Sequence, residues 1–121
     1  MRMIRLYADE AGESHFEDVD VPFMDKSFAP PAPAIGVSAP FETRQLVIVR
    51  LPADWPPDWH PSPKRQLWLG VQGNIRVTVS DGETRKLPAG TLLFMEDVTG
   101  KGHATVPLNG QAVIGAIAQL E

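Results

Sequence analysis

The fold of this chain is decided by the stretch Gln72–Glu83, which reads QGNIRVTVSDGE. Its central residues alternate strictly between apolar and polar, which puts Ile75, Val77 and Val79 on one face of a strand. A Gln-Gly-Asn sequence precedes this strand and an Asp-Gly pair follows it, and both are hairpin turn signals. The stretch therefore predicts a β-strand bounded by tight turns.

The same kind of pattern recurs along the rest of the chain. An Asn-Gly turn at Asn109-Gly110 separates two further candidate strands, and no window shows a helical stripe with caps. Many short strands at regular spacing predict an all-β sandwich or barrel. The proline-alanine stretch Ser27–Gly36 is expected to be an extended loop. Candidate strands lie at Ile4–Tyr7, Phe16–Val21, Arg44–Arg50, Asn74–Ser80, Gly90–Met95, His103–Val106 and Gln111–Ile117.

Composition limits the class of protein. With 121 residues and 43% hydrophobic content, the chain is expected to form a single domain over residues 1–121. Candidate strands and a proline-rich loop are expected in 1–42, and the remaining candidate strands in about 43–120. There is no cysteine, no signal-peptide pattern and no apolar run of the ~18 residues that span a bilayer. The net charge of -4 and scattered basic residues argue against nucleic acid, so we expect a cytoplasmic protein without membrane or nucleic-acid partners.

His60 and Gln66 are candidate site residues. On one straight strand they would lie ~20 Å apart, at ~3.3 Å per residue. Proline cannot donate to a β-ladder, so Pro61 and Pro63 favour an edge or a turn. We therefore expect His60 to end one strand and Gln66 to open the next, with the two side chains side by side. Alternation then points Trp68 into the interior together with Gln66, as a core or pocket-wall residue.

His103 follows the loop Thr99–Gly102 and is expected to face the same interior. The imidazoles of His60 and His103 and the amide oxygen of Gln66 would make a metal site with only three ligands. Imidazole suits zinc, iron, copper, nickel and manganese. Glu96 or Asp97 would supply a carboxylate, although residues of this kind are most often loop carboxylates, with Asp97 capping the following turn. The third histidine, His15, is expected on the surface. Trp55 and Trp59 are expected to cover a barrel end or a subunit contact.

The segment from His60 to Gly73 resembles the first motif of the cupin superfamily, Gly-x5-His-x-His-x(3–4)-Glu-x6-Gly. His60 matches the first histidine and Gly73 the final glycine, while Gln66 replaces the glutamate. Ser62 stands where the second histidine is expected, and Asp54 where the first glycine is expected.

The second cupin motif, Gly-x5-Pro-x-Gly-x2-His-x3-Asn, has a weaker counterpart. Gly90 opens it, and His103 matches its histidine when two residues are inserted. Glu96 replaces the proline, Val98 the inner glycine and Pro107 the asparagine. The resemblance covers roughly Thr43 to Leu120.

This resemblance implies a cupin-type double-stranded β-helix, an RmlC-like jelly-roll barrel with little helix. It also implies a homodimer, because members of the family commonly pair through outer sheets and N-terminal strands. His60, Gln66 and His103 would hold a divalent metal such as zinc, iron, nickel or manganese. The pocket would be completed by a hydroxyl, a guanidinium, an indole and a carboxylate, from Ser62, Arg65, Trp68 and Glu96.

Several functions remain open at this point. The first is a small cupin that binds a divalent metal, a small organic molecule, or both, in the barrel interior. The second is a metal-free binding or sensing module, and the third is a structural dimer whose barrel is filled by Trp68. The residues leave open whether the chain is an enzyme, since this barrel hosts many unrelated activities.

Overall fold

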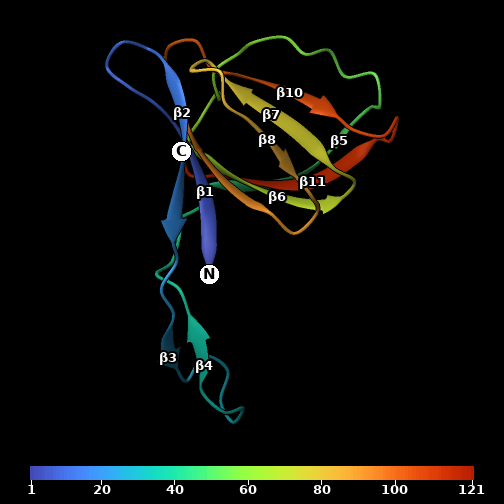
Figure 1. Ribbon diagram of the computed structural model, residues 1–121. Coiled ribbons are helices and arrows are strands. Elements are labelled where there is room, and N and C mark those ends of the chain that lie inside the picture. The colour runs from blue at the N-terminus through green and yellow to red at the C-terminus, as the bar shows by residue number, and fades with distance from the viewer.

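The computed structural model describes residues 1–121 and contains strands but no helix, which confirms the expected all-β class (Figure 1). No helix is therefore present that could cross a membrane. The strands are β1 (Arg2–Ala8), β2 (Ser14–Asp20), β3 (Met24–Lys26), β4 (Ile35–Val37), β5 (Gln45–Leu51), β6 (Gln66–Gln72), β7 (Ile75–Val79), β8 (Thr84–Leu87), β9 (Leu92–Glu96), β10 (His103–Pro107) and β11 (Val113–Gln119).

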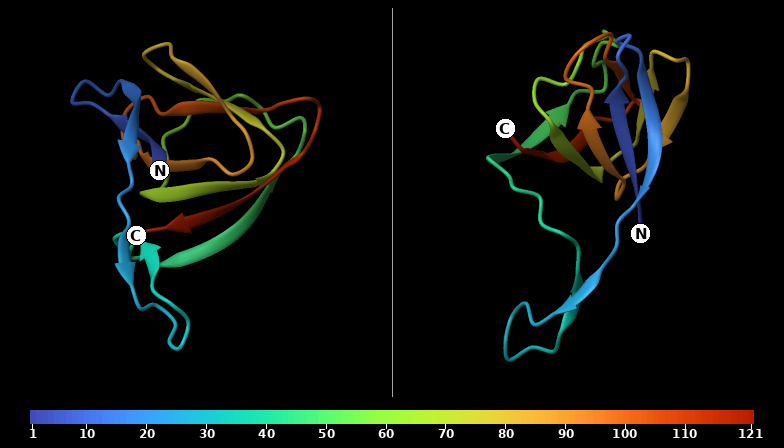
Figure 2. Two further views of the ribbon diagram at one scale, coloured as in Figure 1. Left: turned by 60° about the horizontal axis from the view of Figure 1, so that its bottom comes forward. Right: turned by 90° about the vertical axis from the view of Figure 1, so that its left-hand side faces the viewer.

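Two sheets face each other and enclose the core (Figures 1 and 2). The larger sheet has the strand order β2-β1-β9-β6-β11-β5, and the smaller has the order β10-β7-β8. Neighbouring strands are antiparallel except β1 and β9, which run parallel. The alternating face of β7 is buried as predicted, because Ile75, Val77 and Val79 point between the sheets. The core joins both sheets through Leu6, Phe16, Trp68, Ile75, Val77, Val79, Leu87, Leu93, Met95 and Val113.

The proline-rich stretch Ser27–Gly36 is not the simple extended loop that was expected. Its last two residues belong to β4, which pairs only with β3 to form a hairpin that projects from the barrel (Figures 1 and 2). The prolines occupy the tip of this arm, since they lack the N–H that a ladder needs. Large apolar side chains on the arm stay open to solvent, with Met24 76% exposed and Phe28 64% exposed. The homodimer implied by the resemblance stays a prediction.

Trp68 and Gly115 make a close contact between the neighbouring strands β6 and β11 of the large sheet. Trp68 on β6 lies beside β11, where its indole covers the position of a missing side chain at Gly115. A methyl group at Gly115 would collide with three ring carbons of Trp68. At Gly70, which pairs with Gly115, a methyl group would meet its nearest neighbour, Ala89, at an ordinary 3.5 Å. The two paired glycines therefore have different roles.

A polar cluster joins the turns at one end of the barrel. His15 is partly exposed, and its Nε2 lies 2.7 Å from Asp9 while its Nδ1 lies 2.7 Å from Asp81. These two carboxylates sit in the β1–β2 and β7–β8 turns, so the imidazole ties both turns together. Hydrogen bonds to Asp9 and Asp81 raise the pKa of His15, and the bond from His15 lowers the pKa of Asp9. The pKa of Asp81 is lowered by the backbone N–H of Glu83 and then by His15.

Replacing Gly115 by alanine should destabilise the fold by about 1–3 kcal/mol, the usual cost of overpacking a core. The matched substitution Gly70→Ala should cost less than about 1 kcal/mol, because its methyl group would meet Ala89 and the Trp68 Nε1 only at an ordinary 3.5 Å. Urea unfolding of both variants measures the difference. Equal stability losses would contradict the contact with Trp68.

The His15 cluster predicts a pH-dependent stability. A raised histidine pKa stabilises the fold fully below the ordinary value of 6.5, and this stabilisation disappears as pH rises through the folded-state pKa. The difference in free energy of unfolding between the parent chain and His15→Gln should therefore be larger at pH 6 than at pH 9. Urea titrations at both values test this, and a gap that is constant or grows with pH would contradict it.

Candidate functional site

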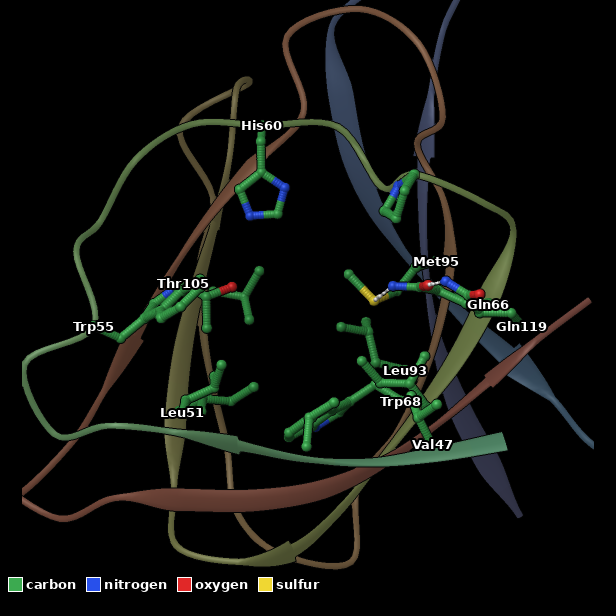
Figure 3. Close-up of a pocket in the computed structure, with 15 residues that line it drawn as sticks. Val47, Leu51, Trp55, His60, Gln66, Trp68, Leu93, Met95, Thr105 and Gln119 are labelled. Carbon is green, nitrogen blue, oxygen red and sulfur yellow. Dashed lines mark hydrogen bonds between the residues drawn. The ribbon is translucent and has the colours of Figure 1, made fainter. Parts of the chain in front are cut away.

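A cavity of about 360 Å³ lies between the two sheets (Figure 3). Strand alternation supplies most of its wall, because the inward residues of β5, β6, β7, β9, β10 and β11 converge on it. The loop between β5 and β6 contributes the rest. Ten of the fifteen lining residues are hydrophobic: the full set is Val47, Val49, Leu51, Trp55, His60, Pro63, Gln66, Trp68, Ile75, Val77, Leu93, Met95, Thr105, Ile117 and Gln119.

Three of the residues singled out in the sequence line this cavity, namely His60, Gln66 and Trp68. Gln66 opens β6 as predicted, and the alternation that turns Trp68 inward is also observed. The Trp68 indole is both core and pocket wall, since it is 6% exposed and borders the cavity. Trp55 lines the cavity as well, from a loop position where it was expected to cover a barrel end.

His60 does not end a strand, contrary to the expectation. Strand β5 stops at Leu51, and a loop with five prolines between residues 52 and 63 separates it from β6. Proline lacks the donor that a ladder requires, so His60 forms only one isolated bridge, with His103. Two backbone hydrogen bonds of 3.0 and 3.1 Å make this bridge. His60 and Gln66 consequently occupy different walls of the cavity (Figure 3).

The loop can approach β10 this closely because residue 102 is glycine. Gly102 has a φ of 73°, and any Cβ there would collide with the backbone of His60 and Pro61. The ring of His60 points into the cavity (Figure 3), and its Nδ1 lies 3.0 Å from the carbonyl of Pro61. Its Nε2 is the nitrogen left for a ligand.

His103 is buried behind His60 and does not line the cavity. The ring centroids of the two histidines are 4.9 Å apart. The Nδ1 of His103 lies 2.6 Å from one carboxylate oxygen of Asp97, and Ser62 donates to the other oxygen at 2.7 Å. Asp97 is fully buried, so it is neither an open loop carboxylate nor a turn cap. It fastens the β5–β6 loop to the barrel.

The amide of Gln66 belongs to a ladder that crosses three strands. Gln45 donates to the side-chain oxygen of Gln119 at 2.6 Å, and Gln119 donates to the side-chain oxygen of Gln66 at 3.1 Å. Gln66 in turn directs its Nε2 to the sulfur of Met95 at 3.8 Å (Figure 3). Neither Gln45 nor Gln119 was singled out in the sequence, because only the register of β5, β6 and β11 places them together.

Arg65 and Glu96 lie outside the cavity. Leu93 and Met95 point inward along β9, so alternation turns Glu96 to the outer face. There it accepts hydrogen bonds from Arg5 at 2.6 Å and Arg65 at 3.1 Å. The bond to Glu96 raises the pKa of Arg5, and bonds to Glu121 and then Glu96 raise that of Arg65. Both residues belong to an ion-pair network on the barrel surface.

The residues present do not fit a divalent metal. Nowhere do three or more histidine, cysteine, aspartate or glutamate side chains gather so that they could hold one. The carboxylate of Asp97 accepts from Ser62 and His103, and the Gln66 oxygen that would be a ligand accepts from Gln119. His60 and His103 alone would offer two nitrogen donors, and only His60 borders the cavity.

The cavity wall carries no formal charge from Asp, Glu, Lys or Arg. His60 is the only histidine of the lining. Gln66, Gln119 and Thr105 supply neutral polar groups among apolar neighbours. The arrangement suits an uncharged molecule that is mainly hydrophobic and has few polar atoms.

The buried Asp97 network predicts unequal losses of stability. Asp97→Ala leaves the buried His103 nitrogen and Ser62 hydroxyl without their acceptor, and should cost about 3 kcal/mol or more. Ser62→Ala removes one hydrogen bond and should cost about 1 kcal/mol. Urea unfolding compares the two variants. A smaller loss for Asp97→Ala than for Ser62→Ala would contradict this account of the loop.

The sequence matches no protein-family model, and no curated protein matches it. Among solved structures, the chain is similar to the Schizosaccharomyces pombe Cnp3 cupin domain, with a TM-score of 0.46 and 17% sequence identity. The match covers 98% of this chain and 83% of that chain.

Proposed function

We propose that this protein binds a small, largely apolar organic molecule inside the barrel, without a metal ion. The observation that carries the proposal is the cavity itself, about 360 Å³ in volume with an uncharged and mainly hydrophobic wall. Binding pockets for small molecules are about 300–1,000 Å³ and combine apolar walls with a few polar groups. A barrel packed shut by Trp68 would leave no such space.

The β5–β6 loop would form the entrance through which a ligand reaches the cavity from solvent. Trp55, His60 and Pro63 belong to the β5–β6 loop and also line the cavity. The C-terminal part of this loop is fixed by the His60–His103 bridge and by the bond from Ser62 to Asp97. Residues 53–60 are exposed, and their only backbone hydrogen bonds are from Trp55 to Pro52 and between His60 and His103. A ligand would enter between this segment and the strands.

The side chains favour binding over catalysis. General acid–base chemistry needs a positioned proton donor and acceptor beside the reacting atoms. His60 is the only such group in the lining, and the buried carboxylate of Asp97 is occupied by Ser62 and His103. No serine or cysteine nucleophile lines the cavity. The protein is therefore proposed as a carrier or sensing module.

The neutral fluorescent probe N-phenyl-1-naphthylamine tests the proposal. The fluorescence of the probe should increase when it binds. Val49→Phe should weaken probe binding at least about tenfold, because the larger side chain fills part of the cavity, and a tenfold loss corresponds to about 1.4 kcal/mol of binding free energy. Val71→Phe is the matched control. Val71 lies on β6 of the same sheet, but its side chain is 58% exposed and does not line the cavity. Equal effects of the two substitutions, or no binding, would overturn the proposal.

The same titration tests whether probe binding requires a metal ion. Probe affinity should be unchanged by EDTA and by added zinc, nickel, manganese or iron, because the wall offers no three-donor set. A His60→Ala variant should likewise hold no less metal than the parent chain when elemental analysis is applied to both. Stoichiometric metal that is required for probe binding would show that the metal-dependent interpretation is correct instead.

A further inference from the structure

We propose that the cavity selects neutral ligands that carry a carbonyl-type oxygen, and that the side-chain N–H of Gln66 is the group that recognises it. The ligand class is a ketone, aldehyde, ester or amide on an apolar body. This inference rests on the proposed binding function and specifies its ligand. It follows from the orientation of one amide, from its weak partner and from the absence of charge around it.

The orientation of Gln66 is fixed by its neighbours. Gln45, Gln119, Gln66 and Met95 occupy paired positions on β5, β11, β6 and β9. Their side chains form one continuous row in which each amide donates to the next member. The amide oxygen of Gln66 is taken by Gln119, so its NH₂ group faces the other way, toward Met95.

The sulfur of Met95 sets the direction of the whole row. A thioether sulfur accepts hydrogen bonds weakly and has no proton to donate. If the Gln66 amide were turned over, its oxygen would lie against that sulfur, and its NH₂ group would confront the NH₂ group of Gln119. The row therefore runs with every NH₂ group directed from β5 toward β9, and Gln66 presents the last donor.

This last donor lacks a strong acceptor within the protein. Gln66 is 6% exposed, and its only acceptor is the sulfur at 3.8 Å. Its NH₂ group has two N–H bonds, and both Gln66 and Met95 line the cavity. A ligand oxygen in the cavity would replace or supplement a weak contact with an ordinary N–H···O bond. A molecule of the same shape without that oxygen would leave the Gln66 N–H with only its weak contact to the Met95 sulfur.

Charge argues for a neutral acceptor over a carboxylate. No lysine or arginine lines the cavity, and the nearby Arg5 and Arg65 are engaged by Glu96 on the outer face. A carboxylate would lose its hydration in an apolar space without gaining a cationic partner. A carbonyl group is less costly to dehydrate and still accepts from Gln66.

Three compounds of nearly equal size test the inference by displacement of N-phenyl-1-naphthylamine at pH 8. Acetophenone carries the carbonyl oxygen, α-methylstyrene has a CH₂ group in its place, and benzoate is the anion. Acetophenone should bind about two- to tenfold more tightly than α-methylstyrene, the range expected for one neutral hydrogen bond. Benzoate should bind more weakly than either.

Single substitutions identify the donor. Gln66→Met should bring the affinity ratio of acetophenone to α-methylstyrene close to one, while α-methylstyrene still binds. Gln119→Met should reduce the ratio by freeing Gln66 to turn over. Gln72→Met is the matched control on the same strand, and it should keep the parental ratio because Gln72 is exposed and outside the cavity.

The outcomes separate this inference from the proposed function. If neither the naphthylamine probe nor any of the three compounds binds, the proposed function fails and the inference fails with it. If the compounds bind but the ratio is one in the parent chain, or survives in Gln66→Met, only the inference is overturned. Benzoate as the tightest ligand would also overturn it.

Discussion

The contact between the Trp68 indole and the backbone of Gly115 is the interaction on which the rest of the barrel depends. It joins β6 and β11, the fourth and fifth strands of the large sheet, and places a flat aromatic surface against the cavity. Because residue 115 has no side chain, the ring lies close to the sheet and does not fill the space between the sheets. A cavity of about 360 Å³ remains, and the residues of six strands reach it.

A second constraint fixes the entrance. The β5–β6 loop is too rich in proline to join a sheet, so its position depends on a few specific bonds. The buried carboxylate of Asp97 receives Ser62 from the loop and His103 from β10, and Gly102 lets the loop backbone lie against β10. Ser62 and His103, which the motif resemblance would place at ligand positions, are therefore used here to hold the loop against the barrel.

The sequence predicted the strands well and the site only in part. Alternation located β7 and showed that Gln66 and Trp68 point inward, since a period of two needs no knowledge of the neighbours. The same rule applied to β9 would have turned Glu96 outward, once Met95 was known to face the core. Asp97 could not be recognised as buried, because its partners Ser62 and His103 are distant in sequence or separated by a loop.

By itself, the sequence determined the all-β class, the hairpin turns and the inward faces of β6 and β7, because these follow from local periodicity and from glycine and proline. Only the tertiary structure decided what the inward residues do together. The pairing of β5, β11, β6 and β9 aligned three glutamines and a methionine, and the bridge from His60 to His103 kept one histidine at the cavity and buried the other. Strand register and long-range contacts set such arrangements, and no local pattern encodes them.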